Sequence, residues 1–353
     1  MTCTKYVGLD VHQASISIAV LDDDGKMLSQ SIIKTEAATI TDFFKGLTGP
    51  VHLTFEEGCQ AQWLFDILHP LVARIVVCNP KHNKLLLSGN KNDCLDAHNL
   101  ATLLRGNLLK NVYHPTHSST ALKERVRLYE NLTEDSTRVS NRIKAMFRSR
   151  GIACAGRPPY QKAHRDQWLA KIEDCGARAR LSLLYEERDF LKQLRQRAKQ
   201  EMVKEAQGHR AFKALLKVPA LGPVRVAQII ATVWSPQRFR SKRQFWTYCG
   251  LAVVRRTSAD YEFQGGSMRK KAQVTATRGL NHNFNHRLKQ VFKSAAVDAI
   301  KRGQFKAYYQ HQKERGLKVE LVRVQLARKI AAVVLSIFKS GEEFDESRIS
   351  SPA

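Results

Sequence analysis

The sequence predicts an α/β domain over residues 1–110, a helical middle over residues 111–205 and a mostly α-helical domain over residues 206–353. Short β-rich runs alternate with helical segments in the first region, whereas helical spacing dominates the other two. The formal net charge of +26 is also unevenly divided, with −1, +8 and +19 in the three regions in chain order. This division indicates an N-terminal site that needs carboxylates and a C-terminal surface that needs cations.

The first region is expected to begin with three antiparallel strands and to continue with alternating helices and strands. The strands are predicted over residues 6–10, 15–20, 28–34, 51–56 and 74–78. The helices are predicted over residues 41–47, 61–72 and 94–104. This order implies a mixed sheet covered by helices, in which the first and fourth strands can be neighbours.

Two long amphipathic helices are expected in the middle region. Apolar residues recur at close to 3.5-residue spacing from Leu122 to Met146, and a second helical stretch runs from Trp168 to about Ala206. An antiparallel helical hairpin or coiled coil is the natural interpretation, and a bundle packed onto the neighbouring domains is the alternative. From Phe212 the chain is again predicted to be mostly helical.

Composition excludes several classes of protein. With 353 residues, 43% of them apolar, the chain can build substantial cores, and no apolar run reaches the roughly 20 residues of a membrane span. Seven cysteines without a Cys-x-x-Cys pair suit a reducing compartment, and residues 1–10 lack the pattern of a signal peptide. We therefore expect a soluble cytoplasmic protein with an anionic partner and no membrane partner.

Four carboxylates occupy the ends of predicted elements. Asp10 ends the first strand, Glu56 ends the fourth, and Asp93 and Asp96 begin the last helix of the region. Two like charges about 5 Å apart repel by roughly 3 kcal/mol at an effective dielectric of about 20, so a converged cluster would need a divalent cation. An all-carboxylate set favours Mg²⁺ or Mn²⁺, and two such ions suit in-line displacement at a phosphodiester. Each acid taken alone is more often an ordinary cap, whereas all four at these element positions favour a metal site.

Three motifs resemble the signature of a known family. They are Tyr6-Val-Gly-Leu-Asp10-Val-His12, Phe55-Glu56-Glu-Gly58 and Lys91-Asn-Asp93-Cys-Leu-Asp96-Ala97. They resemble the Asp-Glu-Asp-Asp signature of insertion-sequence transposases with a RuvC-like, ribonuclease-H-type domain, a group that includes the Piv-type DNA invertases. Leu216–Pro223 is similar to the family's Pro-Gly-x-Gly helical hairpin, and Phe239–Leu251 to the segment that follows it.

The resemblance covers nearly the whole chain in the family's order. It implies a RuvC-like fold for residues 1–110 and a catalytic-serine transposase domain for residues 206–353. It further implies metal ions held by Asp10, Glu56, Asp93 and Asp96, DNA recombination, and guidance by a bridge RNA. His12 follows Asp10 closely, but a lone histidine is usually structural.

The resemblance also implies a nucleophile. The family's catalytic serine, counted from Gly250-Leu251, falls on Ser258, which would form a covalent phosphoserine link to DNA that the released 3′-hydroxyl then reverses. Arg255 and Arg256 are the nearest cations for stabilising the reacting phosphate.

Departures from the family pattern leave alternatives open. Ala259 replaces a common Gly, so Thr257 and Ser267 remain candidates for the nucleophile. The residues after Glu56 also differ, which leaves Glu57 as a second candidate ligand.

Basic residues of the last region are expected to bind nucleic acid through phosphate contacts, with a steep salt dependence. These residues are Arg238, Arg240, Lys242, Arg243, Arg255, Arg256, Arg269, Lys270 and Lys271. Interleaved aromatics such as Phe239, Phe245 and Trp246 would stack on bases or, more commonly at helical spacing, belong to the core.

Three functions compete on this evidence. The favoured one is a DNA transposase or recombinase that acts as a homo-oligomer, dimer or tetramer, because the acids and Ser258 are separated by more than 150 residues. The alternatives are a RuvC-like nuclease or junction resolvase that uses water, and a nucleic-acid-binding protein without enzyme activity. The sequence contains no Gly-rich phosphate-binding loop that ends in Lys-Ser or Lys-Thr, so ATP-driven transposition is not expected.

Overall fold

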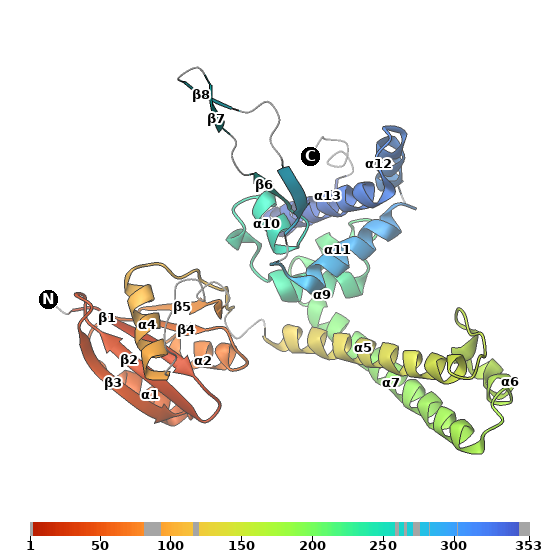
Figure 1. Ribbon diagram of the computed structural model, residues 1–353, viewed down its shortest axis with the longest axis horizontal. Helices are drawn as coiled ribbons and strands as arrows, with labels where there is room; N and C mark the ends of the chain where they lie inside the picture. The colour runs from red at the N-terminus through yellow and green to blue at the C-terminus, as the bar shows by residue number, and fades with distance from the viewer. Residues whose placement is uncertain are drawn as a thin grey trace. The chain divides into compact units, whose positions relative to one another are not determined.

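The computed structural model describes residues 3–80, 93–115, 120–257, 261–264, 267–270, 276–281, 283–301 and 303–345 (Figure 1). The chain divides into two compact units, Met1–Ser118 and Ser119–Ala353, called here the N-terminal and C-terminal units. The C-terminal unit joins the predicted middle and last regions of the sequence, whose mutual boundary stays a prediction.

The N-terminal unit is built on a five-stranded mixed sheet in the order β3-β2-β1-β4-β5. Strands β1 to β3 pair antiparallel, whereas β1 with β4 and β4 with β5 pair parallel, which confirms that the first and fourth strands are neighbours. The arrangement is consistent with a ribonuclease-H-like fold. Its elements are β1 (Lys5–Val11), β2 (Ser15–Leu21), β3 (Met27–Lys34), α1 (Ala37–Lys45), β4 (Val51–Glu56), α2 (Ala61–Leu68), β5 (Arg74–Cys78) and α4 (Asp93–Arg105).

The two faces of the sheet carry side chains of different size, because successive strand residues point to opposite faces. One face packs against helices α1 and α2 through large apolar residues, namely Val7, Leu9, Ile16, Ile18, Val20, Leu53, Phe55 and Val77. The other face is covered by α4 (Figure 1) and has small residues at its centre. Gly8 pairs with Ala19 of β2 and with Thr54 of β4, both fully buried. This flat strip lets a helix backbone lie directly on the sheet.

The C-terminal unit begins with the predicted helical hairpin. Helices α5 (Thr120–Arg148) and α7 (Cys175–Gln207) lie side by side, and α6 (Arg165–Leu169) lies at the tip of the hairpin (Figure 1). Two ion pairs, Arg125–Glu201 at 2.9 Å and Arg142–Glu187 at 3.8 Å, connect the helices. The start of α5 thus lies beside the end of α7, so the helices are antiparallel. A coiled-coil supercoil stays a prediction. The second stretch, expected as one helix, is divided because the Asp174 side chain caps α7 and separates it from α6.

The rest of the C-terminal unit is a helical bundle with short strands. Its helices are α8 (Phe212–Leu216), α9 (Pro223–Val233), α10 (Lys242–Tyr248), α11 (His286–Ala299), α12 (Gly303–Glu314) and α13 (Val319–Ser340). The strands, which the sequence did not predict, are β6 (Val253–Thr257), β7 (Tyr261–Gln264), β8 (Ser267–Lys270) and β9 (Ala276–Leu280). They form two separate antiparallel pairs, β6 with β9 and β7 with β8. No helix within the described ranges is long and apolar enough to span a bilayer.

Candidate functional site

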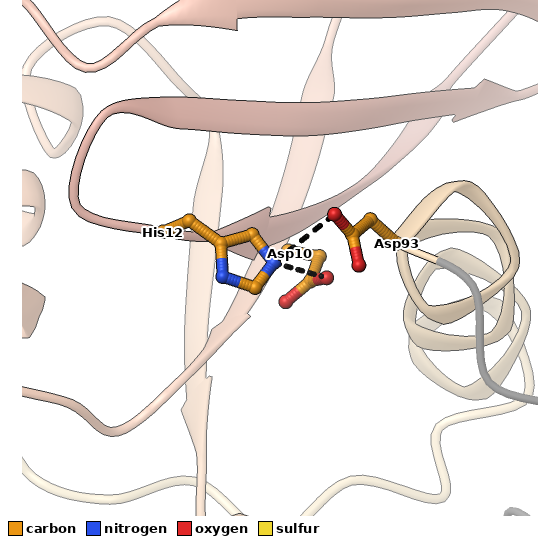
Figure 2. A group of neighbouring side chains, drawn as sticks. All are labelled: Asp10, His12 and Asp93. Carbon is orange, nitrogen blue, oxygen red and sulfur yellow. Dashed lines mark hydrogen bonds and ion pairs between the residues drawn. The ribbon is translucent and has the colours of Figure 1, made fainter.

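Three side chains converge at the end of strand β1 (Figure 2). The Nε2 atom of His12 lies 3.1 Å from Oδ2 of Asp10 and 3.5 Å from Oδ2 of Asp93. One possible ligand atom from each residue lies within 4.8 Å of the other two. Asp10 comes from β1, His12 from the turn that follows it, and Asp93 from the first residue of α4.

The fold sets these positions through the contact between β1 and α4. Gly8 lies two residues before Asp10 and therefore on the same face of β1, toward α4. A Cβ atom on Gly8 would lie 2.1 Å from the carbonyl oxygen of Ala97, so the helix backbone rests on the strand. The first turn of α4, with Asp93 and Asp96, is thereby held near Asp10.

The environment of Asp10 disfavours its negative charge in the absence of a cation. Burial is the main cause that raises the pKa of the Asp10 carboxyl, and the charges of Asp93 and Asp96 raise it further, while His12 opposes the shift. A partly buried carboxylate beside two like charges is stabilised when a cation neutralises them. The donor set of two carboxylates and an imidazole nitrogen fits a divalent metal ion.

The other two predicted ligands lie close to this group. Asp96 shares the first turn of α4 with Asp93, is half-buried, and is near enough to act electrostatically on Asp10. Glu56 is the last residue of β4, and it follows Phe55, which pairs with Leu9 next to Asp10. All four predicted acids therefore occur at one edge of the sheet, and Asp10 and Asp93 make the closest approach to His12.

The alternative ligand Glu57 is engaged elsewhere. Its Oε2 lies 2.6 Å from Nε2 of His114, whose Nδ1 is 3.1 Å from Oε1 of Gln62. The His114 side chain is only 6% exposed and stacks on Phe65. Sequence reasoning missed this contact because its partners are 57 residues apart and no periodic pattern connects them.

Two of the three candidate nucleophiles, Thr257 and Ser267, fall within the described residues. Ser258 lies outside the described residues, directly after Thr257, the last residue of β6. Ser267 is the exposed first residue of β8. The structure therefore leaves the choice of nucleophile as a prediction.

The predicted basic residues differ in their surroundings. Arg238 packs its guanidinium 4.5 Å from the ring of Phe239 and 4.6 Å from that of Tyr248, and it donates a hydrogen bond to the carbonyl of Thr232. Phe239 and Phe245 are buried in the core. By contrast, the side chains of four of the predicted residues are exposed, namely Arg240, Lys242, Arg243 and Arg269.

The remaining predicted basic residues are only partly described. Arg255 and Arg256 lie in β6 and Lys270 ends β8, whereas Lys271 falls outside the described residues. Their role in binding stays a prediction.

A cavity of about 670 Å³ opens beside Gly222 and Pro223, where α9 begins. Glu130 of α5 lines it and forms an ion pair with Arg287 at 2.9 Å and accepts a hydrogen bond from Gln228 at 2.9 Å. Burial raises the pKa of the Glu130 carboxyl, and the two partners oppose that shift. The network joins α5, α9 and α11, which gives it a structural role in the unit.

Two family models match the chain over parts that together cover most of it. Residues 7–150 match a model of the IS110 DEDD type described as "Transposase", and residues 212–310 match one described as "Transposase IS116/IS110/IS902 family". A probable family 20 transposase of Pseudomonas aeruginosa is 22% identical over 281 residues, which are 78% of this chain and 82% of that protein. The transposase for insertion sequence element IS1533 of Leptospira borgpetersenii is 26% identical over 173 residues, 47% of this chain and 50% of that protein.

Proposed function

We infer that this chain, which matches IS110-family transposase models over residues 7–150 and 212–310, is a DNA transposase. We propose that Ser258 is its nucleophile. We further propose that Asp10, Glu56, Asp93 and Asp96 hold divalent metal ions, Mg²⁺ or Mn²⁺. The convergence of Asp10 and Asp93 with His12 at the start of α4 is the observation that carries the proposal of a metal site.

The carboxylates would bind and orient the reacting phosphodiester through the ions that they hold. Bound divalent ions supply charge stabilisation for the attacking and leaving oxygens of an in-line displacement. Asp10 lies on β1 and Asp93 on α4. The backbones of these two elements are in close contact at Gly8 and Ala97, so the fold sets the separation of the two carboxylates. A helix held in contact with the strand in this way suits a site whose geometry must be fixed before the reaction.

In the proposed reaction, Oγ of Ser258 forms a bond to phosphorus while the bond from phosphorus to the 3′ oxygen breaks. Ser258 loses its hydroxyl proton, and the departing 3′ oxygen takes up a proton to become a 3′-hydroxyl. Religation reverses both changes, because a 3′-hydroxyl attacks the phosphoserine and the serine hydroxyl is restored. The phosphoserine bond conserves the energy of the broken phosphodiester, so the exchange needs no ATP.

A covalent adduct distinguishes this reaction from cleavage by water. DNA that carries the ends of the chain's own insertion sequence is incubated with Mg²⁺ or Mn²⁺, and the protein is denatured to reveal DNA linked to it. Wild type and Ser267→Ala should form the adduct, whereas Ser258→Ala should not. Cleavage by wild type without an adduct would instead indicate a RuvC-like nuclease, and an adduct that persists in Ser258→Ala would exclude Ser258.

We also propose that a bridge RNA guides the choice of DNA. The support is the resemblance to guided relatives and a net charge of +19 over residues 206–353, which suits more than one nucleic acid. Purification with RNase and DNase controls, followed by sequencing of co-purified RNA, should yield one discrete RNA encoded beside the gene. Its reproducible absence would favour DNA recognition by the protein.

The proposed assembly is a homo-oligomer, either a dimer or a tetramer. It would act on DNA in the cytoplasm, a reducing compartment that suits the seven free cysteines of each chain. Mixing an Asp10→Ala chain with a Ser258→Ala chain tests whether subunits share the reaction. Recovered activity in the mixture is expected. Failure to recover, while both variants fold and assemble, would contradict sharing between subunits.

A further inference from the structure

We propose that His12 is a metal ligand at the carboxylate centre, and that its imidazole makes this centre select Mn²⁺ over Mg²⁺. The inference rests on the proposed function in one respect, namely that Asp10 and Asp93 hold a divalent ion. It adds a nitrogen donor to a set that the sequence predicts to be made of oxygens alone.

The first support is the spacing of the donor atoms. With metal–ligand distances of about 2.1 Å, two ligands at right angles around an octahedral ion lie about 3.0 Å apart. Nε2 of His12 lies 3.1 Å from the Asp10 oxygen and 3.5 Å from the Asp93 oxygen. The side chains thus need only small rotations to coordinate a common ion, and Figure 2 shows Nε2 pointing between the two carboxylates.

The second support is that the backbone of the turn fixes the position of His12. The His12 amide donates to the carbonyl of Ser15 at 2.9 Å, which closes the turn between β1 and β2. The Thr35 hydroxyl donates to the carbonyl of His12 at 3.0 Å, and the Thr35 amide donates to the carbonyl of Ala14 at 3.1 Å. The side chain of His12 is still 49% exposed, so an ion can reach it from solvent.

The third support is the chemistry of the donor. Mg²⁺ favours oxygen ligands and keeps much of its water, whereas imidazole nitrogen binds first-row transition ions more readily. Carboxylates alone give little discrimination between Mg²⁺ and Mn²⁺. An imidazole that replaces one water therefore adds to the affinity for Mn²⁺ and adds little to that for Mg²⁺.

A role for His12 as a simple ion-pair partner of Asp10 makes a different prediction. A bound cation would then take the place of His12 at the carboxylate, and no nitrogen would contact the metal. The two roles are separated by a measurement that observes nitrogen bonded to the ion.

The test uses the purified full-length chain without DNA, loaded with Mn²⁺ and studied by pulsed electron paramagnetic resonance. Wild type should show hyperfine coupling from one directly bound ¹⁴N nucleus. His12→Gln should lose this coupling, and its affinity for Mn²⁺ should fall about tenfold or more, while its affinity for Mg²⁺ changes less than about twofold. His69→Gln is the matched control, because His69 is an exposed histidine that follows α2 on the opposite face of the sheet.

The outcomes separate the inference from the proposed function. Nitrogen coupling that His12→Gln abolishes and His69→Gln retains supports the inference. Bound Mn²⁺ without nitrogen coupling, or with coupling that survives in His12→Gln, overturns it and leaves the carboxylate site intact. Failure of wild type to bind Mn²⁺ or Mg²⁺ at all overturns both proposals. Equal thermal unfolding of wild type and His12→Gln, expected because His12 is half exposed, verifies that the variant is folded.

Discussion

Gly8 of β1 lies directly against the backbone of α4, where an added Cβ atom would come within 2.1 Å of the Ala97 carbonyl oxygen. The same atom would lie 2.6 Å from the amide nitrogen of Ala101. Real side-chain atoms do not approach backbone so closely, so strand and helix must separate if Gly8 gains a side chain. Asp10 is two residues from Gly8, and Asp96 is next to Ala97. The distance between β1 and α4 at this contact therefore sets the distances between the carboxylates of the site.

Gly8→Ala should therefore impair both the stability and the metal affinity of the N-terminal unit. Forcing a methyl group into this contact should lower the free energy of unfolding by about 1–3 kcal/mol. Displacement of α4 should also weaken Mn²⁺ binding, measured by titration calorimetry. Gly46→Ala is the control, because Gly46 has a helical φ of −73°. A Cβ atom added to Gly46 would have its nearest neighbour, the Phe43 carbonyl oxygen, at 3.4 Å. The control should keep its metal affinity, and equal effects of the two changes would contradict the account.

Variants of Glu56 and Glu57 should separate metal binding from stability. Glu56→Gln should weaken metal binding, because a neutral amide replaces a carboxylate at the strand end. Glu57→Gln should keep metal binding but lower the free energy of unfolding by about 1–3 kcal/mol, because the buried His114 loses its carboxylate partner. Calorimetry with Mn²⁺ and urea denaturation measure the two effects. A loss of metal binding in Glu57→Gln alone would reverse the assignment.

The strands of the N-terminal unit could be predicted from the sequence alone, whereas the contacts that position its site could not. Short β-rich runs were enough to predict all five strands of the N-terminal unit, and their alternation with helices indicated that the first and fourth strands could be neighbours, as they are. The contact of Gly8 with Ala97 and that of Glu57 with His114 join distant parts of the chain, and no local pattern encodes them. His12 is a weak candidate from sequence, because a single histidine carries no information about the direction of its ring. The strands β6 to β9 escaped prediction because each has only four or five residues and, unlike β5, lacks a run of three apolar residues.

The tip of the helical hairpin should be sensitive to acid. Two hydrogen bonds from Arg165, at 2.6 and 2.8 Å, are the main cause that lowers the pKa of Asp189 to about 2, and Lys162 adds to the effect. Because the folded pKa lies below the unfolded value of 3.8, the stabilisation is complete above about pH 4 and is lost as the pH falls toward 2.

Asp189→Asn should accordingly reduce the free energy of unfolding by about 1–2 kcal/mol at neutral pH and by much less near pH 2. Urea denaturation followed by circular dichroism at each pH measures the difference. Asp166→Asn, which changes an exposed residue of α6, should show no such pH-dependent difference. A constant effect of Asp189→Asn from pH 7 to pH 2 would contradict the ion-pair explanation.

Exposed and packed arginines should contribute differently to DNA binding. Arg240→Gln or Arg243→Gln should weaken binding and reduce the slope of log K against log salt by about 0.9 for each phosphate that the variant no longer binds. Arg238→Gln should mainly lower stability, because its guanidinium packs on Phe239 and Tyr248. Fluorescence anisotropy over a range of salt concentrations gives the slopes. An unchanged slope in both exposed variants would place the DNA-binding surface elsewhere.

We expect this DNA transposase to join its own Ser258 to DNA with the help of Asp10, Glu56, Asp93 and Asp96. Mass spectrometry of the peptide that remains attached to DNA after metal-dependent cleavage identifies the linked residue. Wild type should carry a nucleotide adduct on Ser258, and Asp96→Asn should show neither cleavage nor adduct. Metal-dependent cleavage with no adduct, or with an adduct on Thr257 or Ser267, would contradict this expectation.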